Sequence, residues 1–240
     1  MVADPRILVV QHQRDCPPGL LGLWLDAAGC ALDVRHPYAG EPLPADLHHH
    51  DALVVLGGSM GAYDDAAHSW LGPTKELVRS AAERATPTLG ICLGHQLAAV
   101  ALGGTVEVNR HGRQLGVLPM GWTEPARTDP VLGELPARAI HWNVDVVTEP
   151  PAAATVLAMA PDGTVQAARL APRVWGVQCH PEVDDTIVAR WAADEREQLG
   201  AQVVDAALAE MRAATTELAR SWQPVAAAFT RVVRGSATVG

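Results

Sequence analysis

A single cysteine stands where a short apolar run turns into a helix-like stretch, in the sequence Gly90-Ile91-Cys92-Leu93-Gly94. Glycine lies two residues away on each side, which is the arrangement of a nucleophile elbow with sulfur in place of the serine oxygen. Such a corner is strained, and Cβ atoms at the glycine positions would collide with the adjoining strand and helix. The helix dipole favours a thiolate at this position. The pattern predicts a nucleophilic Cys92, with the amide of Leu93 available to an oxyanion.

A base for this thiol is predicted at His180, which follows the strand-like run Trp175–Cys179 in the sequence His180-Pro181-Glu182. Residues two apart in an extended chain project to the same side, so the Glu182 carboxylate can approach and orient the His180 ring. Pro181 biases the preceding residue toward an extended conformation. Because parallel strands bring their carboxyl ends to one edge of a sheet, Cys92 and His180 can meet although they are distant in sequence. The sequence therefore predicts a Cys-His-Glu triad.

The elements that must position these residues alternate along the N-terminal part of the chain. The alternation predicts an α/β fold with a mostly parallel central sheet and helices on both faces. Strands are predicted at Arg6–Gln11, Ala31–Arg35, Asp51–Leu56 and Thr88–Ile91, and helices at Gly19–Ala28, Trp70–Ala85 and Leu93–Leu102.

The remainder of the chain has a different pattern. Short strand-like pieces between Thr105 and Gln178 are separated by Gly, Pro and Asp, and they predict hairpins that extend one edge of the sheet as an antiparallel extension. Helices are predicted at Asp184–Leu199, Ala201–Leu218 and Pro224–Val233. With no linker or internal repeat, we predict one domain over residues 1–240, with a core at residues 6–190 and a C-terminal helical extension at residues 191–234.

Composition narrows the classes of function. The 240 residues carry 18 Lys and Arg against 27 Asp and Glu, a net charge of −9, so a nucleic-acid partner is not expected. No apolar run reaches the roughly 20 residues of a membrane span, and the start of the chain lacks a signal-peptide pattern, so no membrane association and a cytoplasmic location are predicted. The four cysteines form no CxxC pair, so neither a metal site, another cofactor nor a disulfide framework is expected.

Other candidate residues receive structural interpretations. The run His48-His49-His50 is interpreted as a solvated turn, and the glycine-rich run Gly57–Gly61 lacks the Lys-Ser/Thr of a phosphate loop. The remaining interpretations are solvated helix starts at Asp64-Asp65 and Asp184-Asp185, structural roles for Cys16 and Cys30, and core positions for Trp122, Trp142 and Trp175.

Three segments resemble the class I, or triad, glutamine amidotransferases, and in particular the glutaminase domain of GMP synthase and its stand-alone relatives. They are VVLGGSMGAYDD at Val54–Asp65, LGICLGHQLAAVALGG at Leu89–Gly104 and GVQCHPEV at Gly176–Val183. The resemblance implies a flavodoxin-like fold in which Cys92 is the nucleophile, His180 the acid/base and Glu182 its orienter. It also implies an oxyanion hole formed by the amides of Gly58 and Leu93, and a role for Gln96 in holding the glutamyl end of the substrate.

The sequence departs from this family at three places. Cys179 replaces a usual aromatic residue, Gln114 stands where a Glu commonly precedes the next strand, and Asn143 with Val144 replaces a His-Gly pair. Since the last pair belongs to a loop near the family's active site, we expect it to influence the choice of substrate.

Three functions follow as hypotheses. The first is a glutamine amidotransferase or glutaminase that hydrolyses glutamine through a γ-glutamyl thioester on Cys92 and delivers ammonia to a separate synthetase. The second is a γ-glutamyl peptidase or hydrolase, whose substrate is another γ-glutamyl small molecule such as an amide or conjugate. The third is a regulatory protein that keeps the fold without catalysis.

Overall fold

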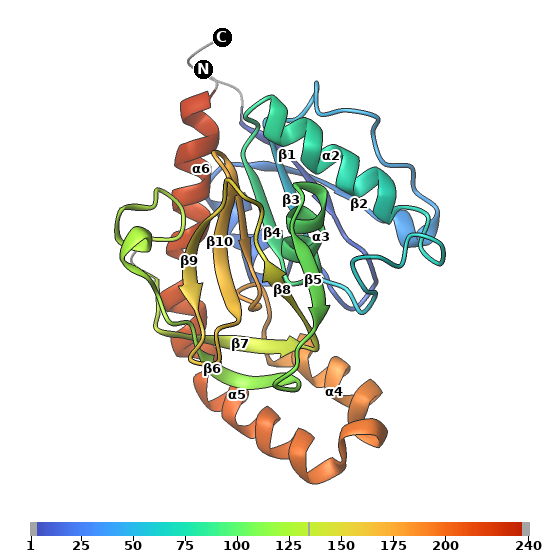
Figure 1. The fold of residues 1–240 in the computed structure, drawn as a ribbon, viewed down its shortest axis with the longest axis vertical. Coiled ribbons are helices and arrows are strands. Elements are labelled where there is room, and N and C mark those ends of the chain that lie inside the picture. Colours follow the sequence, from blue (N-terminus) through green and yellow to red (C-terminus); the bar gives the residue numbers. More distant parts are fainter. Residues whose placement is uncertain (1–3, 134, 237–240) are drawn as a thin grey trace.

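A seven-stranded sheet forms the centre of the molecule in the computed structural model, which describes residues 4–133 and 135–236 (Figure 1). Its strand order is β2-β1-β3-β4-β11-β10-β9; the first five strands are parallel, and β10 and β9 continue the sheet in antiparallel pairing. The predicted fold class is therefore confirmed. The strands are β1 (Arg6–Val10), β2 (Ala31–Arg35), β3 (Ala52–Val55), β4 (Thr88–Ile91), β9 (Thr155–Met159), β10 (Val165–Ala171) and β11 (Val174–Val177).

Helices cover both faces of this sheet. The helices are α1 (Gly19–Ala27), α2 (Leu71–Glu83), α3 (Leu93–Ala101), α4 (Asp185–Leu199), α5 (Ala201–Trp222) and α6 (Pro224–Ser236), with short 3₁₀ turns at Pro37–Ala39 and Glu124–Thr128. Alternation along β1 divides the core, because successive side chains of a strand point to opposite faces. Ile7 and Val9 pack on the side of α1 and α6, whereas Leu8 and Val10 pack on the side of α2 and α3.

The antiparallel strands correct one detail of the sequence prediction. Only β9 and β10 extend the central sheet; β5 (Thr105–Val108) pairs with β8 (Asp145–Glu149), and β6 (Gln114–Pro119) pairs with β7 (Arg138–Asn143), as separate two-stranded sheets. The outer edge of β9 is already occupied, because Thr123 donates its amide to Leu157 and Met159 donates to Gly121. A loop segment therefore covers the position where a further strand would add.

The C-terminal helices enclose one end of the molecule, where α4 and α5 form a hairpin beneath β6 and β7 (Figure 1). The Asp184 side chain accepts the amide of Ile187 and caps α4, as predicted. Helix α5 continues to Trp222 instead of ending at Leu218, because the Trp222 side chain is buried and its indole N–H donates to Arg138. The hairpin places one face of α4 beside the carboxyl ends of the central strands.

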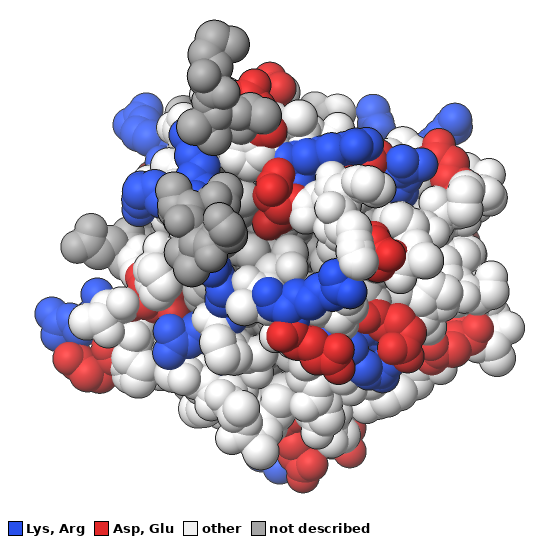
Figure 2. All heavy atoms as spheres, turned by 90° about the horizontal axis from the view of Figure 1, so that it is seen from above, with Lys and Arg blue, Asp and Glu red and all other residues white. Residues whose placement is uncertain are grey.

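Charged side chains of both signs are intermixed on the face seen from above in Figure 2. Within the described ranges, no helix is long and apolar enough to cross a membrane.

A tight approach of β3 and α3 depends on Gly94. A Cβ atom at this position would lie 2.0 Å from the Val55 carbonyl oxygen. We expect Gly94→Ala to lower the free energy of unfolding by about 3 kcal/mol, because the backbone of β3 cannot yield as a side chain could. Chemical denaturation measures this effect. Gly72→Ala is the control, since a Cβ there would lie 3.5 Å from Asp65; equal stability of the two variants would contradict the prediction.

Candidate active site

The predicted elbow is present at Cys92. The residue lies between β4 and α3 as the N-cap of the helix, with φ 49° and ψ −107°. A positive φ is costly for a residue with a side chain, and it turns the chain sharply enough to aim the thiol out of the sheet. A Cβ at Gly90 would lie 2.5 Å from the Gly94 carbonyl oxygen, so the flanking glycines are required as the sequence predicts.

His180 and Glu182 lie beside this elbow because β11 and β4 are parallel neighbours. Val177 is in register with Ile91, and the Cys92 amide donates to the Val177 carbonyl over 2.8 Å. The two strands thus deliver the cysteine and the histidine to one edge of the sheet. The His180 Nδ1 atom is 2.7 Å from Glu182 Oε1, and both side chains are buried. The structure therefore brings the three predicted triad residues together.

The surroundings of His180 favour its charged form. Burial lowers the pKa of His180, but the charges of Glu182 and Cys92 and the hydrogen bonds to both outweigh burial and raise that pKa to about 10. The Trp191 ring packs edge-on against the imidazole at a centroid distance of 4.7 Å, and the His180 amide donates to Ile140. These contacts hold the ring in one orientation, with its second nitrogen directed to the thiol.

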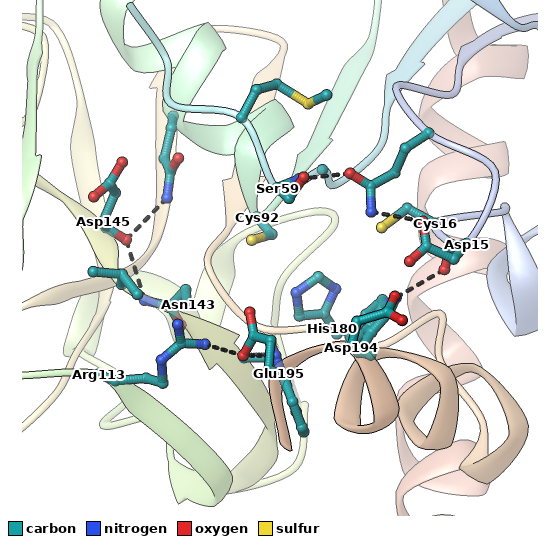
Figure 3. A pocket seen from close by; sticks show the side chains of 17 residues that line it. Asp15, Cys16, Ser59, Cys92, Arg113, Asn143, Asp145, His180, Asp194 and Glu195 are labelled. Carbon is teal, nitrogen blue, oxygen red and sulfur yellow. Dashed lines mark hydrogen bonds and ion pairs between the residues drawn. The ribbon is translucent and has the colours of Figure 1, made fainter. Parts of the chain in front are cut away.

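A pocket of about 400 Å³ opens over Cys92 and His180. Figure 3 shows Asp145 and Asn143 on one side of the cysteine and Asp15 and Cys16 on the other. Burial, and then the charge of Asp64, raise the pKa of Asp145. The pocket is therefore elongated across the nucleophile and carries carboxylates at both ends.

The two residues predicted for the oxyanion hole adjoin the nucleophile. Gly58 lines the pocket, and a Cβ at Gly58 would lie 3.0 Å from Leu93 Cδ2, so these residues are in close contact. Leu93 is the first residue of α3, and the first amides of a helix have no intrahelical acceptor. Both positions are thus compatible with amide donation into the pocket.

Gln96 also lines the pocket, but its amide nitrogen already has protein partners. The Gln96 Nε2 atom donates to the Asp145 carbonyl over 2.9 Å and to Gln178 Oε1 over 3.1 Å. Its predicted contact with the glutamyl end of a substrate remains a proposal, and the structure adds a contact with the protein interior that sequence reasoning missed.

Two of the departures from the family pattern are partners of each other. The Asn143 Nδ2 atom donates to Gln114 Oε1 over 3.1 Å, and Gln114 Nε2 in turn donates to Thr164. Asn143 and Val144 line the pocket, whereas Gln114 lies behind them. The third departure, Cys179, is fully buried, and burial raises the pKa of its thiol. A buried side chain at this position agrees with its predicted packing role.

Helix α4 contributes pocket residues that the sequence did not indicate. Asp194 and Glu195 line the pocket below His180, and Glu195 forms an ion pair with Arg113. The Trp142 indole N–H also donates to Glu195 over 3.0 Å. The position of α4 directly after the His-Pro-Glu segment was the available signal, since its first turns had to pass the site. Trp142 and Cys16, interpreted as core and structural residues, are buried and also line this pocket.

The remaining candidates lie outside the pocket. His50 Nε2 is 2.9 Å from Asp33 Oδ2, and no group of three or more potential metal ligands occurs at residues 4–133 or 135–236. Asp64 and Asp65 do not start a helix, so that interpretation was wrong. Asp64 accepts the Gly61 amide and Asp65 pairs with Lys75, which stabilises the loop before α2.

Sequence comparison places this fold and site in a known family. The model of the family "Glutamine amidotransferase class-I" matches residues 25–190, and the chain belongs to this family. GMP synthase of Aeropyrum pernix is 39% identical over 160 residues, which are 65% of this chain but only 28% of that protein. One separately encoded GMP synthase subunit, from Saccharolobus solfataricus, is 37% identical over 66% of this chain and 79% of its own length.

Solved structures agree on the architecture. A glutamine amidotransferase of Thermotoga maritima superposes with a TM-score of 0.84 at 23% identity, over 95% of this chain and 98% of that chain. A glutamine amidotransferase of Methylobacillus flagellatus gives the same score and identity, over 96% of each chain. At this identity the similarity establishes the fold.

Proposed function

We propose that the protein hydrolyses the γ-amide of glutamine through a γ-glutamyl thioester on Cys92. The observation that carries this proposal is the placement of Cys92 on a strained elbow beside a His180–Glu182 pair, at the floor of the pocket. Membership of the class-I glutamine amidotransferase family supports it.

The proposed reaction has two stages. The Cys92 thiolate attacks the γ-carbonyl carbon, and the amides of Gly58 and Leu93 donate to the resulting oxyanion. His180 protonates the nitrogen, the carbon–nitrogen bond breaks, and ammonia leaves a thioester on Cys92. A water molecule then gives a proton to His180 and attacks the thioester, which releases glutamate and regenerates the thiolate. Glu182 keeps the imidazole oriented and its charge balanced, and the sequence of steps needs no cofactor.

We further propose that the ammonia is passed to a separate synthetase. The curated relatives named GMP synthase include a long protein of which this chain covers 28%, and a shorter one, named as a single subunit, of which it covers 79%. These relatives support a division of labour in which one part of an assembly hydrolyses glutamine. The acceptor of the ammonia is then the substrate of a partner protein.

A second candidate is hydrolysis of a larger γ-glutamyl amide or conjugate, and the shape of the pocket favours it. The pocket continues past Cys92 to Asp15 and Asp194, on the side away from Asp145 (Figure 3). Ammonia does not require this space, whereas a bulky leaving amine would occupy it. The carboxylates there favour an amine that carries a further positive charge.

Steady-state kinetics distinguish these functions. The purified protein is assayed for glutamate release from glutamine, a γ-glutamyl anilide, a glutathione-like peptide and a γ-glutamyl diamine. If glutamine is the substrate, we expect its kcat/KM to exceed that of the others by about tenfold or more. The opposite ranking would replace glutamine by a conjugate. No release from any substrate, alone or with a candidate synthetase, would contradict both and leave the regulatory role.

A further inference from the structure

Gln178 connects the nucleophile to the buried interior. It follows β11 directly, its side chain is fully buried, and its backbone amide donates to the Gln166 carbonyl over 2.8 Å. The side-chain amide lies between Gln96 and Cys92. Gln178 Oε1 is 3.1 Å from Gln96 Nε2, and Gln178 Nε2 is 3.5 Å from Cys92 Sγ.

The orientation of this amide is fixed by a backbone group. The Asp145 carbonyl oxygen can only accept, so the Gln96 atom 2.9 Å away must be the nitrogen Nε2. That same nitrogen also faces Gln178, so the atom it meets there must be the oxygen Oε1. The remaining atom of the Gln178 amide, which faces the sulfur, is therefore the nitrogen Nε2. A reversed amide would place two N–H donors against each other and an oxygen against the thiolate.

We propose that Gln178 is a hydrogen-bond donor to the Cys92 thiolate and that Gln96 is the positioning residue that holds it in the donating orientation. The proposal rests on Cys92 being the nucleophile. An amide N–H stabilises a buried thiolate more than a neutral thiol, because donation to an ionised acceptor is the stronger interaction. Gln178 does not titrate, so it donates at every pH and acts alongside His180.

This arrangement also links the pocket wall to the nucleophile. The Asp145 carbonyl that holds Gln96 also accepts from Asn143, over 3.1 Å. The chain of contacts runs from the Asn143–Asp145 segment through Gln96 and Gln178 to the sulfur. A disturbance of that segment therefore reaches Cys92 without touching it.

The pH dependence of Cys92 alkylation tests the donor role. Iodoacetamide is applied over a range of pH, and the Cys92 peptide is followed by mass spectrometry, which separates it from the other cysteines. We expect Gln178→Met, which keeps the length but removes the N–H donor, to move the midpoint of the alkylation curve up by about one pH unit. Gln178→Glu, which keeps the acceptor for Gln96 and adds charge beside the thiolate, is expected to move it further in the same direction.

Matched variants separate the donor role from a packing role. Gln166→Met removes an equally buried glutamine on the adjacent strand, where Nε2 donates to Thr164, and is expected to keep the wild-type midpoint. Gln96→Met is expected to shift the midpoint upward by less than Gln178→Met. The titratable groups coupled to Cys92, namely His180, Cys16 and Cys179, and the Glu182 partner of His180 are unchanged in these variants.

A wild-type midpoint in both Gln178→Met and Gln178→Glu would overturn the proposal, and so would an equal shift in Gln166→Met. Failure of the proposed function has a different signature: the wild-type protein would then hydrolyse no γ-glutamyl substrate, although Cys92 could still show the predicted shifts. The two outcomes are read from separate measurements.

Discussion

Cys92→Ala is expected to lower glutamate release by at least about 10⁴-fold, because alanine carries no nucleophile and the remaining donors cannot form a thioester. The fold should persist. Alanine keeps the Cβ atom that the elbow already accommodates at φ 49°. A coupled assay of glutamate measures the rate, and circular dichroism with thermal unfolding measures the fold.

The control for this variant is Cys30→Ala. The Cys30 thiol is buried away from the pocket and contacts Thr230 over 3.4 Å. We expect Cys30→Ala to retain full activity. Wild-type turnover by Cys92→Ala would show that the sulfur is not the attacking atom.

Glu182→Gln is expected to lower kcat by about 10³-fold, because a neutral amide can neither balance an imidazolium nor fix its tautomer. The pH profile should change as well. In the wild type the charges of Glu182 and Cys92 and the hydrogen bonds outweigh burial and hold the pKa of His180 near 10, so the alkaline fall of kcat is expected near that pH. Without the Glu182 charge, burial dominates and the pKa of His180 falls. The alkaline limb therefore moves toward acid.

The same shift has a consequence for stability. The pKa of His180 in the folded protein lies above its ordinary value of 6.5, so the charged ring contributes stability that is fully present below pH 6.5. That contribution is lost as the pH rises toward 10. Glu182→Gln should reduce this dependence, whereas Asp205→Asn, which removes an exposed carboxylate paired with Arg196, should leave kcat and its profile unchanged. An unaltered alkaline limb in Glu182→Gln would contradict the orienting role.

Local sequence was sufficient to predict the geometry of the catalytic residues. The backbone of Gly90–Gly94 is determined by steric limits within a few residues, and the His180–Glu182 contact follows from the alternation of an extended chain. The meeting of the two segments needed only the general property that parallel strands end at one edge.

Contacts between distant elements could not be predicted in this way. Asp194 and Glu195 reach the pocket because α4 folds back beside the sheet, and the pairing of Asn143 with Gln114 depends on the register of β6 and β7. The separate pairing of these strands depends in turn on the loop that covers β9. No periodicity in the sequence encodes which edge is already occupied.

The central claim is that a thiolate at Cys92 attacks a γ-glutamyl carbonyl in this pocket, and covalent trapping tests it most directly. The wild-type protein is treated with a diazo-norleucine reagent, a glutamine-like electrophile, and the intact mass and labelled peptide are determined. We predict one adduct, located on Cys92, which glutamine or the preferred γ-glutamyl substrate prevents and which Cys92→Ala does not form. Glutamate release that continues with Cys92 unlabelled, or an adduct on another residue that abolishes it, would contradict the account.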